Sequence, residues 1–110
     1  MKKESRRLLK LRSDKGNIDS MYQYGMLFYK GDGVQINSKE TAKYIKITAD
    51  NNHTDAITMY GNLLFSGFGV TMDKKEAIKY FKHGIEKEDS TAMVNYEYML
   101  ENGEDTEMNK

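Results

Sequence analysis

The chain lacks cysteine, proline and tryptophan, and its charges cancel, because 17 basic residues stand against 17 acidic ones. Without cysteine there is no disulfide, no thiolate metal ligand and no cysteine nucleophile. Without proline, helices run uninterrupted. A net charge of zero gives no overall field to attract nucleic acid or an anionic membrane. These absences favour a helical domain and exclude several kinds of catalytic and metal site.

Long hydrophobic runs are also missing. The leucines near the start, Leu8, Leu9 and Leu11, are interrupted by Lys10 and Arg12, so they do not form the apolar core of a signal peptide. No stretch approaches the roughly 18 apolar residues of a membrane-spanning helix. We therefore expect a cytoplasmic location and no membrane association. The length of 110 residues predicts a single domain.

Glycine, in contrast, recurs at regular intervals and marks an internal repeat. Residues 24–34 read YGMLFYKGDGV, and 36 positions later residues 60–70 read YGNLLFSGFGV. Weaker similarity at the same period extends the repeat back to residues 5–14 and forward to residues 92–100. A repeat of this length predicts stacked supersecondary units, each of which buries its apolar face against its neighbours.

Apolar residues at helical spacing predict six helices, over residues 5–13, 19–30, 39–50, 55–66, 74–87 and 91–102. Ser5, Ser38 and Asp73 are the expected N-caps. The predicted fold is an all-α, right-handed α/α solenoid of antiparallel helix pairs. Its expected parts are an N-terminal half-repeat (1–19), repeat 1 (20–55), repeat 2 (56–91), a C-terminal half-repeat (92–103) and a disordered acidic tail (104–110).

Several residues are predicted to build the repeat rather than to bind a ligand. Gly25 and Gly61 lie inside helices, where glycine costs about 1 kcal/mol relative to alanine. A close approach of the paired helix, with Tyr44 and Tyr80 as the large counterparts, would compensate this cost. The full set of predicted structural residues is Gly25, Gly31, Gly33, Val34, Tyr44, Gly61, Gly67, Gly69, Val70, Ala77 and Tyr80.

The pattern resembles the SEL-one-like repeat (SLR) family, which is related to the tetratricopeptide repeat. In the second copy the matches are Ala56, Gly61, Gly67, Gly69, Val70, Asp73, Lys75, Ala77, Tyr80 and Phe81. The period of 36 favours this family over tetratricopeptide repeats of 34. The chain departs from the pattern at Tyr24 and Tyr60, where leucine is usual, and at Glu97, which replaces a glycine. The resemblance implies a non-enzymatic scaffold or adaptor without cofactor or metal.

The resemblance also implies that the first helix of each pair lines a concave face. Ser20, Tyr24 and Phe28 are predicted to point into the core of the first pair. The outward positions differ between copies, which is typical of a groove fitted to one protein or peptide partner. The alternative is that these residues pack against the next helix or are ordinary surface residues. The predicted binding residues are Tyr22, Met26, Tyr29, Thr58, Asn62, Phe65, Val94 and Tyr98.

Self-association is the second hypothesis for function. Half-repeats at the two ends are expected to leave apolar residues partly uncovered, because terminal repeats need polar caps. These residues are Leu8, Leu9 or Leu11 at one end and Val94, Tyr98 or Met99 at the other. The basic start and acidic end of successive copies would attract one another. The chain would then be a self-associating segment or a part of a longer array.

The remaining candidates favour structural interpretations. His53 and His83 have no metal-ligand spacing and are predicted to be surface histidines. The G-x-G stretches at 31–33 and 67–69 follow helices rather than strands, so we expect them to end helices and not to cradle phosphate. The basic residues of the first helix offer a site for RNA or an acidic partner, but they lack interleaved aromatic residues. Nucleic-acid binding is therefore not expected.

Overall fold

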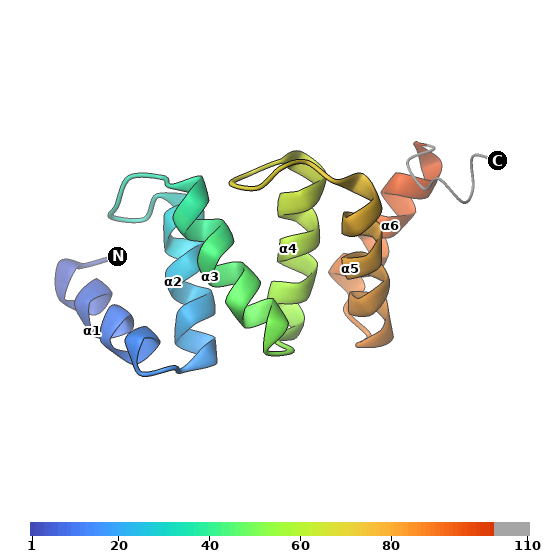
Figure 1. Cartoon of the computed structure of the whole chain (residues 1–110). Coiled ribbons are helices and arrows are strands. Elements are labelled where there is room, and N and C mark those ends of the chain that lie inside the picture. The colour runs from blue at the N-terminus through green and yellow to red at the C-terminus, as the bar shows by residue number, and fades with distance from the viewer. Residues whose placement is uncertain (103–110) are drawn as a thin grey trace.

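The computed structural model describes residues 1–102, which form six α-helices and no strand. Consecutive helices pack against each other along an elongated array that measures 52 × 25 × 19 Å and runs from α1 to α6 (Figure 1). The predicted all-α repeat fold is confirmed. Gly103 and the predicted tail, 104–110, lie outside the described residues. The helices are α1 (Lys3–Asp14), α2 (Ile18–Lys30), α3 (Ser38–Asp50), α4 (Thr54–Ser66), α5 (Lys74–Glu86) and α6 (Ser90–Glu101).

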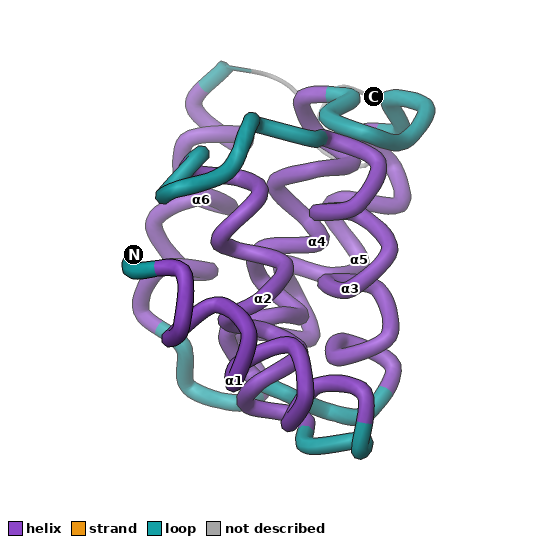
Figure 2. Tube along the Cα trace, turned by 90° about the vertical axis from the view of Figure 1, so that its left-hand side faces the viewer, coloured by secondary structure: helices purple, strands orange, loops and turns teal. Residues whose placement is uncertain are grey.

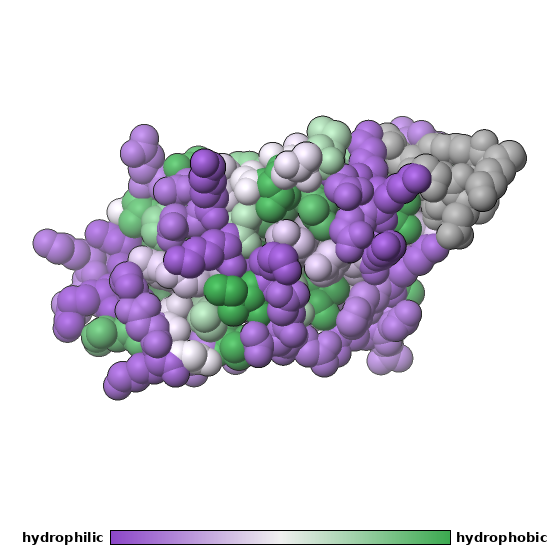
Figure 3. Space-filling model, viewed as in Figure 1, coloured by the Kyte–Doolittle hydropathy of each residue, from purple (hydrophilic) through white to green (hydrophobic). Residues whose placement is uncertain are grey.

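The helices form two layers. Seen along the array, α2 and α6 lie on one side and α3 and α5 on the other (Figure 2). Hydrophilic side chains cover much of the face that α3 and α5 present, with smaller apolar areas between them (Figure 3). The core lies between the layers and contains fully buried apolar residues from α3 to α6, such as Ile45, Ile57, Leu63, Phe81 and Met99.

The start of each helix from α2 to α6 is fixed by a side chain that accepts a backbone N–H group. For α2, α4 and α6 these residues are Asn17, His53 and Asp89, which are spaced 36 residues apart. For α3 and α5 they are Asn37 and Asp73, again at the same interval. N-caps of this kind satisfy donors that the helix itself leaves unpaired. The repeat therefore extends to its capping residues.

Two of the three predicted N-caps are wrong. α1 begins after Lys2, whose side chain makes no capping hydrogen bond, and Ser5 lies within the helix. α3 is capped by Asn37, one residue before the predicted Ser38, because the Asn37 side chain accepts from the N–H group of Glu40. The third prediction, Asp73 for α5, is confirmed.

Glycine ends α2 and α4 as predicted. Gly31 and Gly67 have φ angles of 70° and 75°, in the left-handed region. Their N–H groups donate to the carbonyl oxygens of Leu27 and Leu63, which closes the last turn of each helix. Side chains with a Cβ atom adopt this conformation at a cost, so glycine is the favoured residue here.

The helix-interior glycines allow close helix packing, as the sequence predicted. A Cβ atom at Gly25 would lie 3.0 Å from the Cβ of Tyr44 on α3. A Cβ atom at Gly61 would lie only 2.7 Å from the Phe81 ring on α5. No real Cβ atom is accommodated at 2.7 Å without movement, so each glycine leaves the space that its paired helix fills.

The tyrosines follow the same period. Tyr24 meets Tyr44 edge to face with ring centroids 5.1 Å apart, and Tyr60 meets Tyr80 in the same way at 5.1 Å. Burial raises the pKa of Tyr24, Tyr60 and Tyr80. Tyr24 is nevertheless only half-buried, and so is Phe28, whereas Ser20 is buried. Of the three residues of α2 predicted to point into the core, one is fully enclosed.

Candidate protein-binding surface

Three shallow hollows lie in a row on the face formed by α2, α4 and α6, which we call the first-helix face. The first, of about 250 Å³, lies beside α2 and includes Met26 and Leu27. The central hollow, of about 130 Å³, is lined by residues of α2, α4 and the start of α6. The third, of about 120 Å³, lies between α4 and α6 and includes Phe65 and Tyr98.

The hollows adjoin one another. Tyr22 lines both the first and the central hollow, and Asn62 lines both the central and the third. These two side chains are therefore the boundaries that a ligand crossing from α2 to α6 would contact in turn. The hollows form one continuous surface along the array rather than three separate sites.

Most of the predicted binding residues are brought together on this surface. Those that line a hollow are Tyr22, Met26, Thr58, Asn62, Phe65 and Tyr98. The other two do not. Tyr29 packs edge to face on Phe68, with ring centroids 5.3 Å apart, and Val94 is exposed but lines none of the three hollows. A binding role for any of them stays a prediction.

Thr58 corrects one part of that prediction. Its side chain is buried, with an exposed fraction of 3 %, whereas the helical wheel placed it on the outward face. Its hydroxyl group donates to Oδ2 of Asp89, in the turn before α6. A Cβ atom at Gly84 of α5 would lie 2.7 Å from the same hydroxyl oxygen. Thr58 is thus a packing residue that joins α4 to the next turn.

Tyr22 is held by a histidine that the sequence analysis assigned to the surface. The rings of Tyr22 and His53 stack at 4.5 Å with an interplanar angle of 23°. His53 is half-buried; its Nδ1 accepts from the N–H group of Ala56, and its Nε2 lies 3.2 Å from Oδ1 of Asp19. His53 therefore caps α4 and orients Tyr22. The signal that would have found it is the shared register of Asn17, His53 and Asp89.

Charge also acts on Tyr22. Burial raises the pKa of its hydroxyl group, and the carboxylates of Asp55 and Asp89 raise it further. Both carboxylates line the central hollow with Tyr22. Neither aspartate was predicted from the sequence, because they are 34 residues apart and do not occupy equivalent positions of the 36-residue repeat.

The third hollow is walled by aromatic rings and amides. Phe65 and Tyr98 meet edge to face with ring centroids 6.4 Å apart. Nδ2 of Asn95 donates to Oδ1 of Asn62 at 2.8 Å. This bond engages only the acceptor oxygen of the Asn62 amide. Asn95 was not predicted, and no repeat position marked it.

The ends of the array leave apolar residues exposed, as predicted, although one named residue at each end is buried. Leu9 and Met99 are buried, at 2 % and 1 % exposure, so neither is available to a second copy. The remaining predicted end residues are exposed, namely Leu8, Leu11, Val94 and Tyr98.

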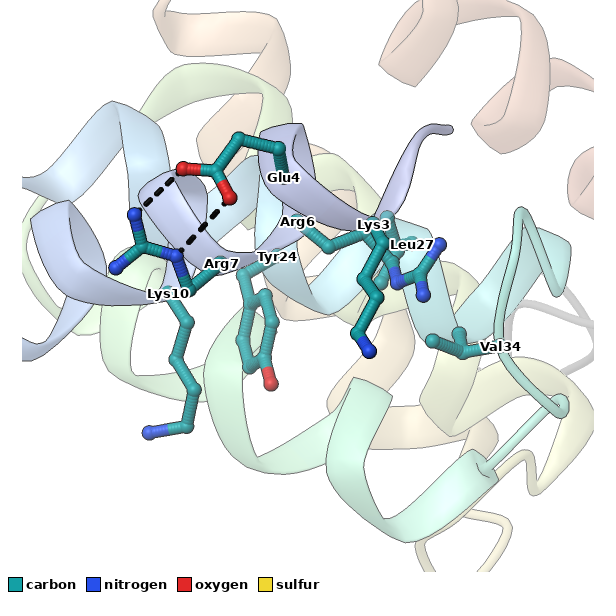
Figure 4. A pocket seen from close by; sticks show the side chains of 8 residues that line it. All are labelled: Lys3, Glu4, Arg6, Arg7, Lys10, Tyr24, Leu27 and Val34. Carbon is teal, nitrogen blue, oxygen red and sulfur yellow. Dashed lines mark hydrogen bonds and ion pairs between the residues drawn. The ribbon is translucent and has the colours of Figure 1, made fainter.

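A larger hollow, of about 570 Å³, lies between α1 and α2 and is lined by basic residues of α1 around Tyr24 (Figure 4). Two of its four basic residues form ion pairs: Arg7 donates to Glu4, and Lys10 donates to Asp14 at 2.9 Å. Arg6 donates to the backbone carbonyl oxygen of Met1 at 2.7 Å. Lys46 pairs with Asp50 at the equivalent positions of α3, at 3.0 Å. We therefore interpret these charges as ion pairs of the repeat rather than as a separate ligand site.

Neither a metal-binding cluster nor a membrane-spanning helix is found in the part of the chain that the structure describes. Within residues 1–102, no group of three or more histidine, aspartate or glutamate side chains has a geometry that would hold a metal ion. None of the six helices has the length and apolar character that crossing a bilayer requires.

The fold and the repeated first-helix face define a helical repeat protein of stacked helix pairs. Comparison with protein families identifies which kind: the Sel1 repeat model matches residues 18–53 and 54–89, so the chain belongs to the Sel1 repeat family. This confirms the resemblance seen in the sequence. Sel1 repeats form scaffold folds that commonly take part in protein interaction. No curated protein shows a significant match to the sequence.

Solved structures agree with this assignment. A Sel1 repeat protein from Oxalobacter formigenes is 32 % identical, with a TM-score of 0.75 over 79 % of this chain and 36 % of its own. The protective antigen c5321 of uropathogenic Escherichia coli, which displays an SLR fold, is 23 % identical, with a TM-score of 0.82 over 86 % of this chain and 20 % of its own. The chain thus spans about a third and a fifth of these two proteins.

A third similar structure is cysteine-rich protein B (hcpB) of Helicobacter pylori, with a TM-score of 0.76 and 19 % identity over 86 % of this chain and 71 % of that protein. At this identity the likeness concerns the fold alone. The present chain, in contrast, has no cysteine.

Proposed function

We propose that the chain is a non-enzymatic scaffold or adaptor that binds a peptide segment of a partner protein along the first-helix face. The observation that carries the proposal is the row of three adjoining hollows across α2, α4 and α6. A groove formed by equivalent helices of successive repeats offers an extended partner one contact region per repeat.

The chemistry of the surface supports a peptide as the ligand. Aromatic side chains such as Tyr22, Phe65 and Tyr98 provide large contact areas with little loss of side-chain freedom, and such residues dominate protein-binding energies. The amide of Asn62 lies between two hollows, where it is available to a peptide carbonyl group. Apolar contacts and single polar groups together are typical of peptide-binding grooves.

Head-to-tail self-association is the weaker candidate. If copies continued the repeat, α1 of one copy would pack on α6 of another as α3 packs on α2. In both repeats this contact has glycine on the first helix, at 25 and 61, where an added Cβ atom would lie 3.0 and 2.7 Å from the nearest atom of the paired helix. The equivalent residue of α6 is Glu97. Its side chain would occupy the space of the incoming helix, and its carboxylate would lose water on burial.

The test is a selection of peptides from a random display library on the intact chain. A groove variant exchanges one residue of each hollow that is not part of the core: Gln23→Ala, Asn62→Ala and Tyr98→Ser. A control variant, Ile36→Ser with Met72→Ser, removes exposed apolar side chains outside the three hollows. The proposal expects peptides that bind the wild type and the control but lose binding to the groove variant. Peptides that bind all three proteins equally would contradict it.

A further inference from the structure

The central hollow differs from its neighbours in charge. The carboxylates of Asp55 and Asp89 line it, and no lysine, arginine or histidine lies among its described lining residues. Asp55 forms no ion pair with any residue in 1–102. Asp89 accepts from the Thr58 hydroxyl and from the N–H group of Thr91, and neither donor carries a charge. Two negative charges therefore face one small hollow without a cation of the chain itself.

The surroundings do not neutralise these charges fully. Asp55 lies in the first turn of α4 and Asp89 caps α6, so both helix dipoles favour the carboxylates. Each helix N-terminus is equivalent to a positive charge of about half a unit, which is less than the full negative charge of a carboxylate. His53, which stacks on Tyr22, is already occupied because its two nitrogens contact the Ala56 N–H group and Asp19. A negative field remains in the hollow, open to a ligand.

The flanking hollows have a different chemistry. The first contributes Met26 and Leu27, and the third contributes Phe65, Tyr98 and Met99. A ligand that crosses the whole surface thus passes an apolar region, an acidic region and a second apolar region. Tyr22 and Asn62, at the two boundaries, offer an aromatic ring and an amide to a side chain in the middle.

We infer that the partner segment carries a lysine or arginine whose cationic head occupies the central hollow, with apolar residues on both sides of it in the chain. This inference rests on the proposed function. Charge complementarity carries it: a cation gains from two carboxylates, whereas an acidic side chain would be repelled. The flanking apolar residues bury the aromatic and methionine surfaces that line the other hollows.

The experiment uses the display library on the full-length chain, with the sequences of the selected peptides as the first readout. The second readout is affinity for a variant, Asp55→Asn with Asp89→Asn, which removes two charges and keeps the size of both side chains and an efficient N-cap on α6. The amide NH₂ group that replaces Oδ2 of Asp89 can donate to the Thr58 hydroxyl, which then accepts. The control, Asp14→Asn with Asp50→Asn, changes the net charge equally but at carboxylates of α1 and α3 outside the central hollow.

The expected peptides share one basic residue between apolar residues. They lose at least tenfold in affinity for the Asp55/Asp89 variant and less than about twofold for the control. Replacing their basic residue by glutamine gives a similar loss of affinity for the wild type and little further loss of affinity for the variant. The reason is that the peptide change and the protein change remove the same charge interaction. Raising the salt concentration weakens wild-type binding only.

Two results would overturn the inference and are distinguishable. Groove-dependent peptides without a basic preference, bound equally by the Asp55/Asp89 variant, would refute the acidic hollow as a recognition site and leave the proposed function intact. A selection that yields no groove-dependent peptide would refute the proposed function, and the inference would fail with it.

Discussion

Replacing Gly61 with alanine tests the helix packing on which the repeat depends. In an exposed helix this exchange stabilises by about 1 kcal/mol, because alanine has the higher helix propensity. Here the new Cβ atom would lie 2.7 and 2.9 Å from two atoms of the Phe81 ring and 3.2 Å from the Cβ of Tyr80. Phe81 is only 1 % exposed, so its ring has little space to move.

Overpacking of this kind costs about 1–3 kcal/mol. Set against the propensity gain, this cost predicts that Gly61→Ala lowers the free energy of unfolding by up to about 2 kcal/mol.

Gly25→Ala is the matched control, because the nearest contacts of its added Cβ atom are 3.0 to 3.4 Å and include the flexible end of Ile45. We expect this second exchange to be nearly neutral. Urea unfolding followed by circular dichroism measures both, with the slope of the transition as a check on two-state behaviour. A Gly61→Ala chain stabilised by about 1 kcal/mol would refute the close approach of α4 and α5.

Exchanges at three further positions test the ends of helices and one buried contact by the same unfolding assay. Gly67→Val forces a β-branched side chain to a φ of 75° and should cost about 1–2 kcal/mol; an unchanged melting temperature would refute the helix-ending role. His53→Ala removes the α4 cap and should cost about 1 kcal/mol, whereas His53→Asn should keep most of it. Thr58→Val removes the hydroxyl donor to Asp89 and should cost about 1 kcal/mol; equal stability would show that the buried bond contributes nothing.

The repeat and its helices were predictable because each helix is specified by its own local sequence and because the same pattern occurs twice. Glycine at 25, 31, 61 and 67 recurs at one interval, and each has a local physical reason for being glycine. Helix ends agreed within two residues. The caps were harder, because Asn37 and Ser38 are adjacent and both are good capping residues. His53 was missed because histidine is an uncommon N-cap, although its register with Asn17 and Asp89 identifies it.

The candidate surface was only partly predictable. A helical wheel treats each helix alone, so it placed Thr58 outward, whereas the turn before α6 covers that residue. The central hollow was not predictable from the repeat, because Asp55 and Asp89 are 34 residues apart rather than 36. The contact between Thr58 of α4 and Asp89, in the turn before α6, brings these carboxylates to one hollow with Tyr22. Aligning the repeats identifies positions that share a structural role. It does not identify a site formed by residues at non-equivalent positions of the repeat.

The measurement that tests the central claim most directly is the map of backbone amide chemical-shift changes in the ¹⁵N-labelled chain as a selected peptide is added. The account predicts changes concentrated at the residues of the three hollows on α2, α4 and α6, strongest near Tyr22, Asp55 and Asn62. Little change is expected at the basic hollow of α1 or on the outer face of α3 and α5. Changes centred on α1 or on that outer face would place the binding surface elsewhere and would contradict the account.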